Sequence, residues 1–118
     1  MANYARYLLS GSTSGRVIPV AATATAGTLI HTAVTGVNGF DEVYIWASNV
    51  TSAVVSLTLE WGGVTAPGDH LVKTLSIPAF SPPLPIATGQ VLNGGLVIRA
   101  FAGTASAINL SGYVNRIA

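Results

Sequence analysis

Two histidines and four carboxylates are the side chains of this sequence that could bind a metal ion or transfer a proton. Asp69 and His70 are adjacent and form the only local acid and imidazole pair, whereas His31 stands apart in LIHTAV and is expected on a strand face. A zinc site needs roughly three or four converging ligands, and neither an HxH nor an HExxH spacing occurs. We therefore expect no metal site.

Covalent catalysis would require a nucleophile activated by a neighbouring base. Serine is frequent, but the sequence contains no GxSxG turn of the kind that presents a catalytic serine. A glycosidase pair among the four carboxylates remains open from the sequence, yet none lies in a motif that would raise its pKa. These observations predict no catalytic residue, no cofactor and a protein that is not an enzyme.

The elements that would position these side chains are short strands separated by turns. Signals such as SGSTSG, TGVNG, WGGVTAPGD and LNGG recur along the chain and leave no room for crossover helices. They predict an all-β antiparallel sandwich or barrel with about eight strands. The strand segments expected are 4–9, 16–20, 28–34, 41–48, 53–61, 70–77, 84–92, 96–102 and 107–116.

Three segments show how the strands should bury their faces. In AVVSLTLEW the apolar residues alternate with a mostly polar face, which indicates a strand buried on one side. In DEVYIWASN both faces are apolar or aromatic, with Tyr44 and Trp46 on one of them, and LVIRAFA repeats this two-sided pattern. Asp41 and Glu42 follow a turn and are expected to be solvated. Covering both faces would require partner chains.

The composition favours a single domain that assembles with other proteins. Of 118 residues, 50% are hydrophobic and only 8% are charged, well below the roughly 25% of ordinary soluble domains. The net charge of +1 predicts no binding of nucleic acid or of anionic membrane. The apolar runs are too short or too interrupted for a signal peptide or a membrane span. Cysteine is absent, so disulfides cannot contribute.

The two ends of the sequence are candidate contact regions. Residues 1–15 are expected to form an N-terminal arm or a first strand with a flexible linker, and residues 16–118 a single sandwich domain. Tyr4, Arg6 and Tyr7 in this arm could anchor to a partner, because aromatic residues and arginine are enriched at interface hot spots. At the other end INLSGYVNRIA alternates like a strand, and Arg116 could lie against a neighbouring subunit.

Three other features have a functional interpretation beside a structural one. Tyr44 and Trp46 could form a flat platform for a sugar ring, although burial in a core or subunit interface is the more common use of aromatic pairs. The PxxP spacing from Pro82 to Pro85 is expected to be a rigid connector. Asn49, Val50 and Thr51 match a glycosylation sequon, which we interpret as a turn.

Taken as a whole, the sequence resembles the small capsid decoration, or cement, proteins of tailed bacteriophages. The resemblance rests on a short, cysteine-free, charge-poor β chain with a middle rich in Gly, Thr and Ala, on GFDEVYIWASN and on the ending GYVNRIA. It implies a compact β-sandwich or jelly-roll-like fold and a homotrimer. It also implies a place in the virion, on the outer surface of the capsid, where the protein binds the major capsid protein. The alternative that we keep is a carbohydrate-binding or adhesive module on a phage surface.

Overall fold

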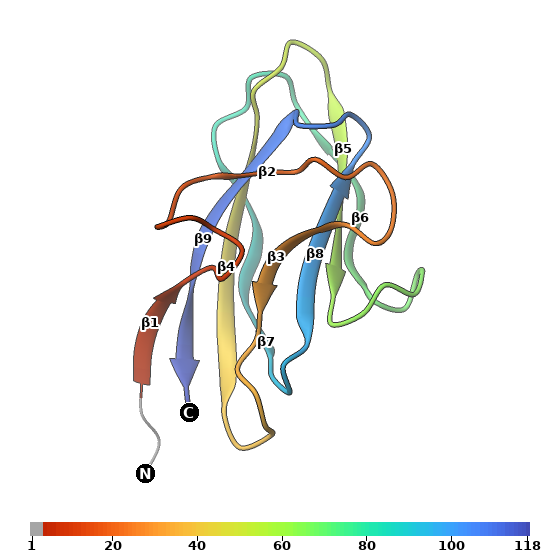
Figure 1. Ribbon diagram of the computed structural model, residues 1–118. Helices are drawn as coiled ribbons and strands as arrows, with labels where there is room; N and C mark the ends of the chain where they lie inside the picture. The colour runs from red at the N-terminus through yellow and green to blue at the C-terminus, as the bar shows by residue number, and fades with distance from the viewer. Residues whose placement is uncertain (1–3) are drawn as a thin grey trace.

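The computed structural model describes residues 4–118 and consists of nine strands and their connecting loops (Figure 1). The strands are β1 (Tyr4–Leu8), β2 (Ile18–Pro19), β3 (Thr28–Thr32), β4 (Phe40–Asn49), β5 (Val55–Trp61), β6 (His70–Ile77), β7 (Leu84–Leu92), β8 (Val97–Ala102) and β9 (Ile108–Ile117). They lie within a few residues of the segments expected from the sequence. No helix in residues 4–118 is long and apolar enough to cross a membrane.

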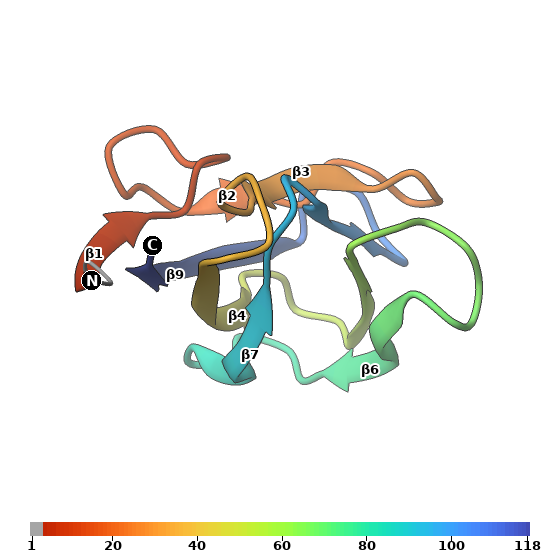
Figure 2. The same cartoon turned by 90° about the horizontal axis from the view of Figure 1, so that it is seen from below.

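The strands form two antiparallel sheets that face each other, so the predicted β-sandwich is confirmed (Figure 2). Sheet A has the order β1-β9-β4-β7, with β2 also pairing with β9, and sheet B has the order β3-β8-β5-β6. Strands β1 and β2 pair with different parts of the same edge of β9, so together they occupy one strand position in sheet A. The nine strands therefore fill eight positions in the two sheets.

The pairing pattern is that of a jelly roll. Strand β5 pairs with β6, β4 with β7, β3 with β8, and β1 and β2 with β9. The chain is thus doubled into one long antiparallel ribbon, which winds so that successive pairs alternate between the two sheets. Because of this winding, segments far apart in the sequence meet at both ends of the sandwich.

Alternating apolar residues fill the space between the sheets. On β4, Val43, Ile45 and Ala47 point inward, and on β5, Val55, Leu57 and Leu59 do the same from the opposite sheet. Each is at most 4% exposed, and the intervening residues of β4 are half-buried on the outer face of sheet A. The alternation with a period of two in the sequence therefore identifies which residues of these strands face the core.

Two expectations about polar residues are wrong. The second face of β5 is not solvated, because Thr58 is 3% exposed and Glu60 is fully buried. The loop that precedes β3 covers Glu60, whose carboxylate accepts hydrogen bonds from Thr25 Oγ1 at 2.5 Å and from the backbone N–H of Gly27 at 2.8 Å. Asp41, expected in solvent after a turn, is also fully buried.

Gly112 allows the two central strands of sheet A to approach each other closely. It lies on β9 opposite Ile45 of β4. A Cβ atom added at Gly112 would collide with the carbonyl oxygen of Tyr44 and lie 3.0 Å from the carbonyl carbon. A glycine inside a strand commonly marks such a backbone approach.

Candidate functional site

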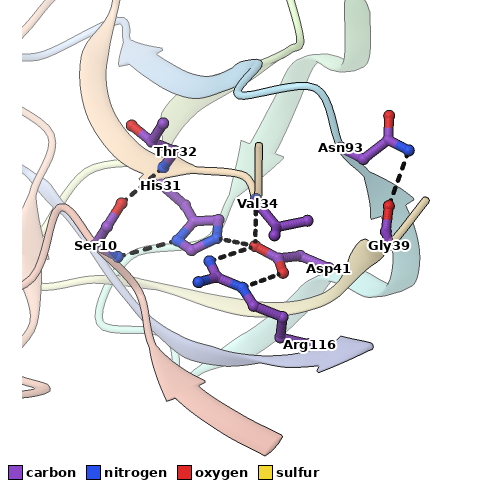
Figure 3. A network of polar contacts seen from close by, with 8 residues as sticks. All are labelled: Ser10, His31, Thr32, Val34, Gly39, Asp41, Asn93 and Arg116. Atoms are coloured by element: carbon purple, nitrogen blue, oxygen red, sulfur yellow. Dashed lines mark hydrogen bonds and ion pairs between the residues drawn. The ribbon is translucent and has the colours of Figure 1, made fainter. Parts of the chain in front are cut away.

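A buried cluster of three ionisable side chains joins the two sheets near the end where β1 and β9 lie side by side (Figure 3). Asp41 on β4 is at its centre. Arg116 on β9 donates two hydrogen bonds to it, from Nε to Oδ1 at 2.7 Å and from a terminal nitrogen to Oδ2 at 3.0 Å. His31 on β3, from the opposite sheet, contacts Asp41 Oδ2 through Nε2 at 2.7 Å. The backbone N–H of Val34 donates to the same oxygen at 3.2 Å.

The hydrogen bonds of His31 fix its neutral tautomer. The backbone N–H of Ser10 donates to Nδ1 at 3.0 Å, so Nδ1 carries no proton and Nε2–H is the donor to Asp41. The Ser10 hydroxyl in turn accepts a hydrogen bond from the backbone N–H of Thr32 at 2.7 Å. The segment after β1 is thereby attached to β3, and protonation of His31 would break that attachment.

The pKa values of the cluster follow from burial and pairing. Burial lowers the pKa of His31 below its usual value near 6.5, and the hydrogen bond to Asp41 opposes this only in part. Burial alone would raise the pKa of Asp41, but hydrogen bonds from Arg116 and His31 outweigh it and lower that pKa. The hydrogen bond to Asp41 raises the pKa of Arg116 further. At neutral pH the cluster therefore holds one ion pair and one neutral imidazole.

The lowered pKa of His31 predicts a loss of stability on mild acidification. Below about pH 6.5 the unfolded chain binds a proton at His31 that the folded chain excludes, so the free energy of unfolding falls until the folded-state pKa is reached. One such group contributes at most about 1.4 kcal/mol per pH unit. Urea unfolding between pH 7.5 and 5 is expected to show this slope in the intact protein and to show a smaller one in His31→Gln.

His70→Gln is the matched control, because it removes the other imidazole from a residue outside the cluster. It is expected to retain the slope. Equal slopes for the intact protein and His31→Gln would contradict the assignment. Asp41 contributes at lower pH, because its depressed pKa gives stability that is present above its unfolded value near 3.8 and is lost as the pH falls through its folded-state value.

The outer face of sheet A carries a row of aromatic rings. Tyr44 on β4 and Tyr113 on β9 are opposite each other in the sheet and stack with ring centroids 5.2 Å apart and planes inclined by 21°. The guanidinium of Arg6 on β1 lies 4.6 Å from the Tyr113 ring centroid. The ring centroid of Trp46 lies 6.1 Å from that of Tyr113. With Arg6 the row crosses three neighbouring strands; its three rings are half-buried, whereas Arg6 is exposed.

This geometry limits what the row can bind. Tyr113 is contacted by Arg6, Tyr44 and Trp46, so little of its ring remains free. Gly89 approaches Tyr44 from the other side, because a Cβ added there would lie 3.2 Å from the tyrosine hydroxyl. A sugar ring could stack only on Trp46, whereas a protein surface could cover the edges of all the rings together.

The residues nominated at the N-terminal end lie in strand β1. Tyr4 and Tyr7 are 65% and 47% exposed, and Arg6 is exposed as well. Strand β1 pairs with β9 of its own chain, and Arg116 lies 4.6 Å from the Tyr7 ring centroid. The structure therefore places residues 4–8 as a first strand. The first three residues of the nominated arm lie outside the described part of the chain.

Arg116 was nominated as a contact to a neighbouring subunit, but its guanidinium is engaged inside the chain. It is 25% exposed and is held by Asp41 below and by the Tyr7 ring. Arg116 therefore fastens β9 to β4 and β1. Of the other nominated residues, Arg6, Tyr44 and Trp46 lie on the outer face of sheet A, and Tyr4 and Tyr7 are exposed on β1.

The other candidates lie at turns and at the ends of strands. Asn49 is 1% exposed and fully hydrogen-bonded at the end of β4, so the sequon is part of a turn. Asp69 accepts a hydrogen bond from the backbone of Thr65, and His70 lies edge-on to Phe101. The structure shows no ion pair between Asp69 and His70 among residues 4–118. The PxxP prolines lie in the loop before β7 and at its start.

A search of residues 4–118 found no group of three or more side chains placed to hold a metal ion. Comparisons with protein-family models, curated proteins and solved structures found no match for this chain.

The cluster of His31, Asp41 and Arg116 was not predicted from the sequence. Each residue was noticed, but each was given a separate role. The available signal was the alternation in DEVYIWASN, where Asp41 has the same parity as Val43 and Ile45. An acidic residue on the buried face of a strand calls for a cationic partner, and Arg116 has the parity of Val114 on the buried face of β9.

Proposed function

We propose that this protein is a capsid decoration protein. It binds the outside of the mature head of a tailed bacteriophage as a homotrimer and stabilises contacts between major capsid subunits. The observation that carries the interaction role is the outer face of sheet A, where Tyr44, Trp46, Tyr113 and Arg6 gather without a second layer over them in residues 4–118. Aromatic and arginine side chains are typical interface anchors.

The scarcity of surface charge supports the same proposal. Of the four carboxylates, Asp41 and Glu60 are fully buried and satisfied inside the chain. The surface keeps few charged side chains, so hydroxyl, amide and apolar groups make up much of it, and another protein can cover these groups without desolvating ions. The resemblance of the sequence supplies the capsid as partner, and as a fold-level analogy jelly rolls recur in viral shells.

Many weak contacts suffice for this role. A decoration protein repeated over a shell touches several capsid subunits at once, so its binding is multivalent. A protein that binds the assembled shell and not its separated subunits stabilises the shell by mass action. Modest anchors on a rigid sandwich are therefore enough.

The test is co-sedimentation with expanded heads that lack the protein. The intact chain is expected to sediment with the heads, and Trp46→Ala is expected to weaken this binding by about tenfold, because truncating an interface tryptophan typically costs more than about 1 kcal/mol. Leu29→Ala is the control, since Leu29 is 41% exposed on β3 of the other sheet and is expected to leave binding unchanged.

A second candidate, sugar binding, is favoured by one observation, the half-buried Trp46 on the outer face of sheet A beside the tyrosine pair. If the intact protein does not sediment with heads of its own phage, the capsid proposal fails. Sugar-dependent quenching of tryptophan fluorescence that disappears in Trp46→Ala would then support the second candidate.

A further inference from the structure

The loops that join β4 to β5 and β6 to β7 lie at one end of the sandwich and expose three apolar side chains. They lie together at the top of Figure 1, away from the N and C marks. The backbone N–H of Phe80 donates to the carbonyl of Thr51 at 3.0 Å, which joins the two loops. Phe80 is 69% exposed, Val50 52% and Val54 64%. We call these three side chains the apolar tip.

Asn49 holds the tip in one conformation. Its side-chain amide donates to the carbonyls of Ala53 at 2.7 Å and Ile77 at 3.1 Å. Its carbonyl oxygen accepts hydrogen bonds from the backbone and the hydroxyl of Thr51 at 2.9 and 2.7 Å. Its backbone N–H donates to the Ser81 hydroxyl at 3.0 Å. Asn49 thus bonds the first loop and the end of β6 through its side chain and the second loop through its backbone N–H, and prolines on either side of Phe80 stiffen that second loop.

Folding does not account for phenylalanine at position 80. Its φ angle is 49°, in the left-handed region that favours glycine and asparagine and disfavours bulky side chains. Its ring is mostly in water, so core packing does not offset that cost. A strained residue held by a well-determined surrounding structure is typical of binding sites. The combination indicates that the ring is displayed for a partner.

We infer that the apolar tip is a preformed anchor that inserts the Phe80 ring into an apolar pocket on a folded protein subunit. The inference rests on the proposed function, under which that subunit is the major capsid protein. Val50 and Val54 would contact the rim of the pocket. The clamp by Asn49 reduces the entropy lost on binding, because the loops are already ordered.

The chemistry of the apolar tip favours binding to a pocket on another protein over binding to a membrane surface or to a second copy of this chain. Segments 49–54 and 78–83 contain no charged residue, whereas segments that bind membrane surfaces usually combine apolar side chains with Lys or Arg. A phenylalanine buries about 150–250 Å², far below the roughly 800 Å² per partner of a stable pair of proteins. One tip cannot hold two copies together, but repeated tips on a shell can act through multivalency.

The test compares Phe80→Asn with Val37→Asn in co-sedimentation with expanded heads. Asparagine tolerates the left-handed backbone, so Phe80→Asn is expected to unfold at the same urea concentration as the intact protein or higher. Its binding to heads is expected to fall by tenfold or more. Val37 is 81% exposed in the loop between β3 and β4, so Val37→Asn removes a comparable exposed apolar group from another loop and is expected to bind normally. Phe80→Leu is expected to bind within about threefold of the intact protein.

Each contrary outcome is distinct. Normal binding by Phe80→Asn overturns the anchor and leaves the decoration proposal in place, whereas absence of binding by the intact protein overturns both. An equal loss of head binding in Val37→Asn overturns the anchor. Flotation of the intact protein with phosphatidylcholine vesicles overturns it as well. A changed oligomer size of Phe80→Asn in light scattering would make the tip a self-contact and also overturn it. Should Phe80→Asn fail to fold, Val54→Asn must show the loss of binding.

Discussion

Replacing Asp41 with asparagine is expected to lower the free energy of unfolding by about 3 kcal/mol, the lower part of the range for a broken buried ion pair, because Asp41 is fully buried and Arg116 only partly so. Asp41 accepts two hydrogen bonds from Arg116 and one each from His31 and the Val34 backbone. An asparagine can present only one carbonyl oxygen to these donors, and its NH₂ group would face donors as well. Urea unfolding at pH 7 measures the loss.

Glu42→Gln is the matched control for this substitution. It makes the same chemical change one residue along β4, where the side chain is half-buried on the outer face of sheet A. It is expected to change stability by less than about 0.5 kcal/mol, as surface substitutions usually do. Similar losses for Asp41→Asn and Glu42→Gln would contradict the central role assigned to Asp41.

Replacing Gly112 with alanine is expected to destabilise the fold by about 3 kcal/mol, the upper part of the range for overpacked cores. The added methyl group would meet the Tyr44 carbonyl oxygen and lie 3.1 Å from the Ile45 Cα, and both are backbone atoms that cannot rotate away. Strands β4 and β9 would have to separate at their centre. Thermal unfolding followed by circular dichroism measures the effect.

Gly68→Ala tests whether the effect is specific to that position. A Cβ atom added at Gly68 has no neighbour within 4 Å, so this substitution is expected to be neutral or slightly stabilising through the unfolded state. If Gly112→Ala were as stable as Gly68→Ala, the close approach of the two strands would not be a constraint on the sequence.

The strands and the sandwich could be predicted because their cause is local. Alternation in AVVSLTLEW and DEVYIWASN is visible over a few residues, and it reports which side chains face the core. The burial of Glu60 could not be predicted in this way. It depends on the loop before β3, more than thirty residues earlier in the sequence, which covers the second face of β5.

The candidate sites were harder to predict from the sequence than the strands, because each site joins residues that are far apart along the chain. Arg116 was recognised as a possible contact, but its partner Asp41 is 75 residues away in the sequence. Tyr44 and Trp46 were correctly placed on one strand face. Their relation to Tyr113 and Arg6 required the order of β1, β9 and β4 in sheet A, which no local pattern encodes. Phe80 drew no attention because its backbone angle and exposure are properties of the folded loop.

The doubled ribbon has a consequence for how the chain acquires its structure. Strands β5 and β6 are the only paired strands that are also consecutive in the described part of the chain. Every other pairing closes a longer segment, at an entropy cost that grows with its length unless inner pairs have already formed. Residues 108–117 lie between β1 and β4, so a ribosome must release them before sheet A can close. Until then both edges that β9 will occupy are open to other chains, and the newly made protein is most vulnerable to mispairing at that stage.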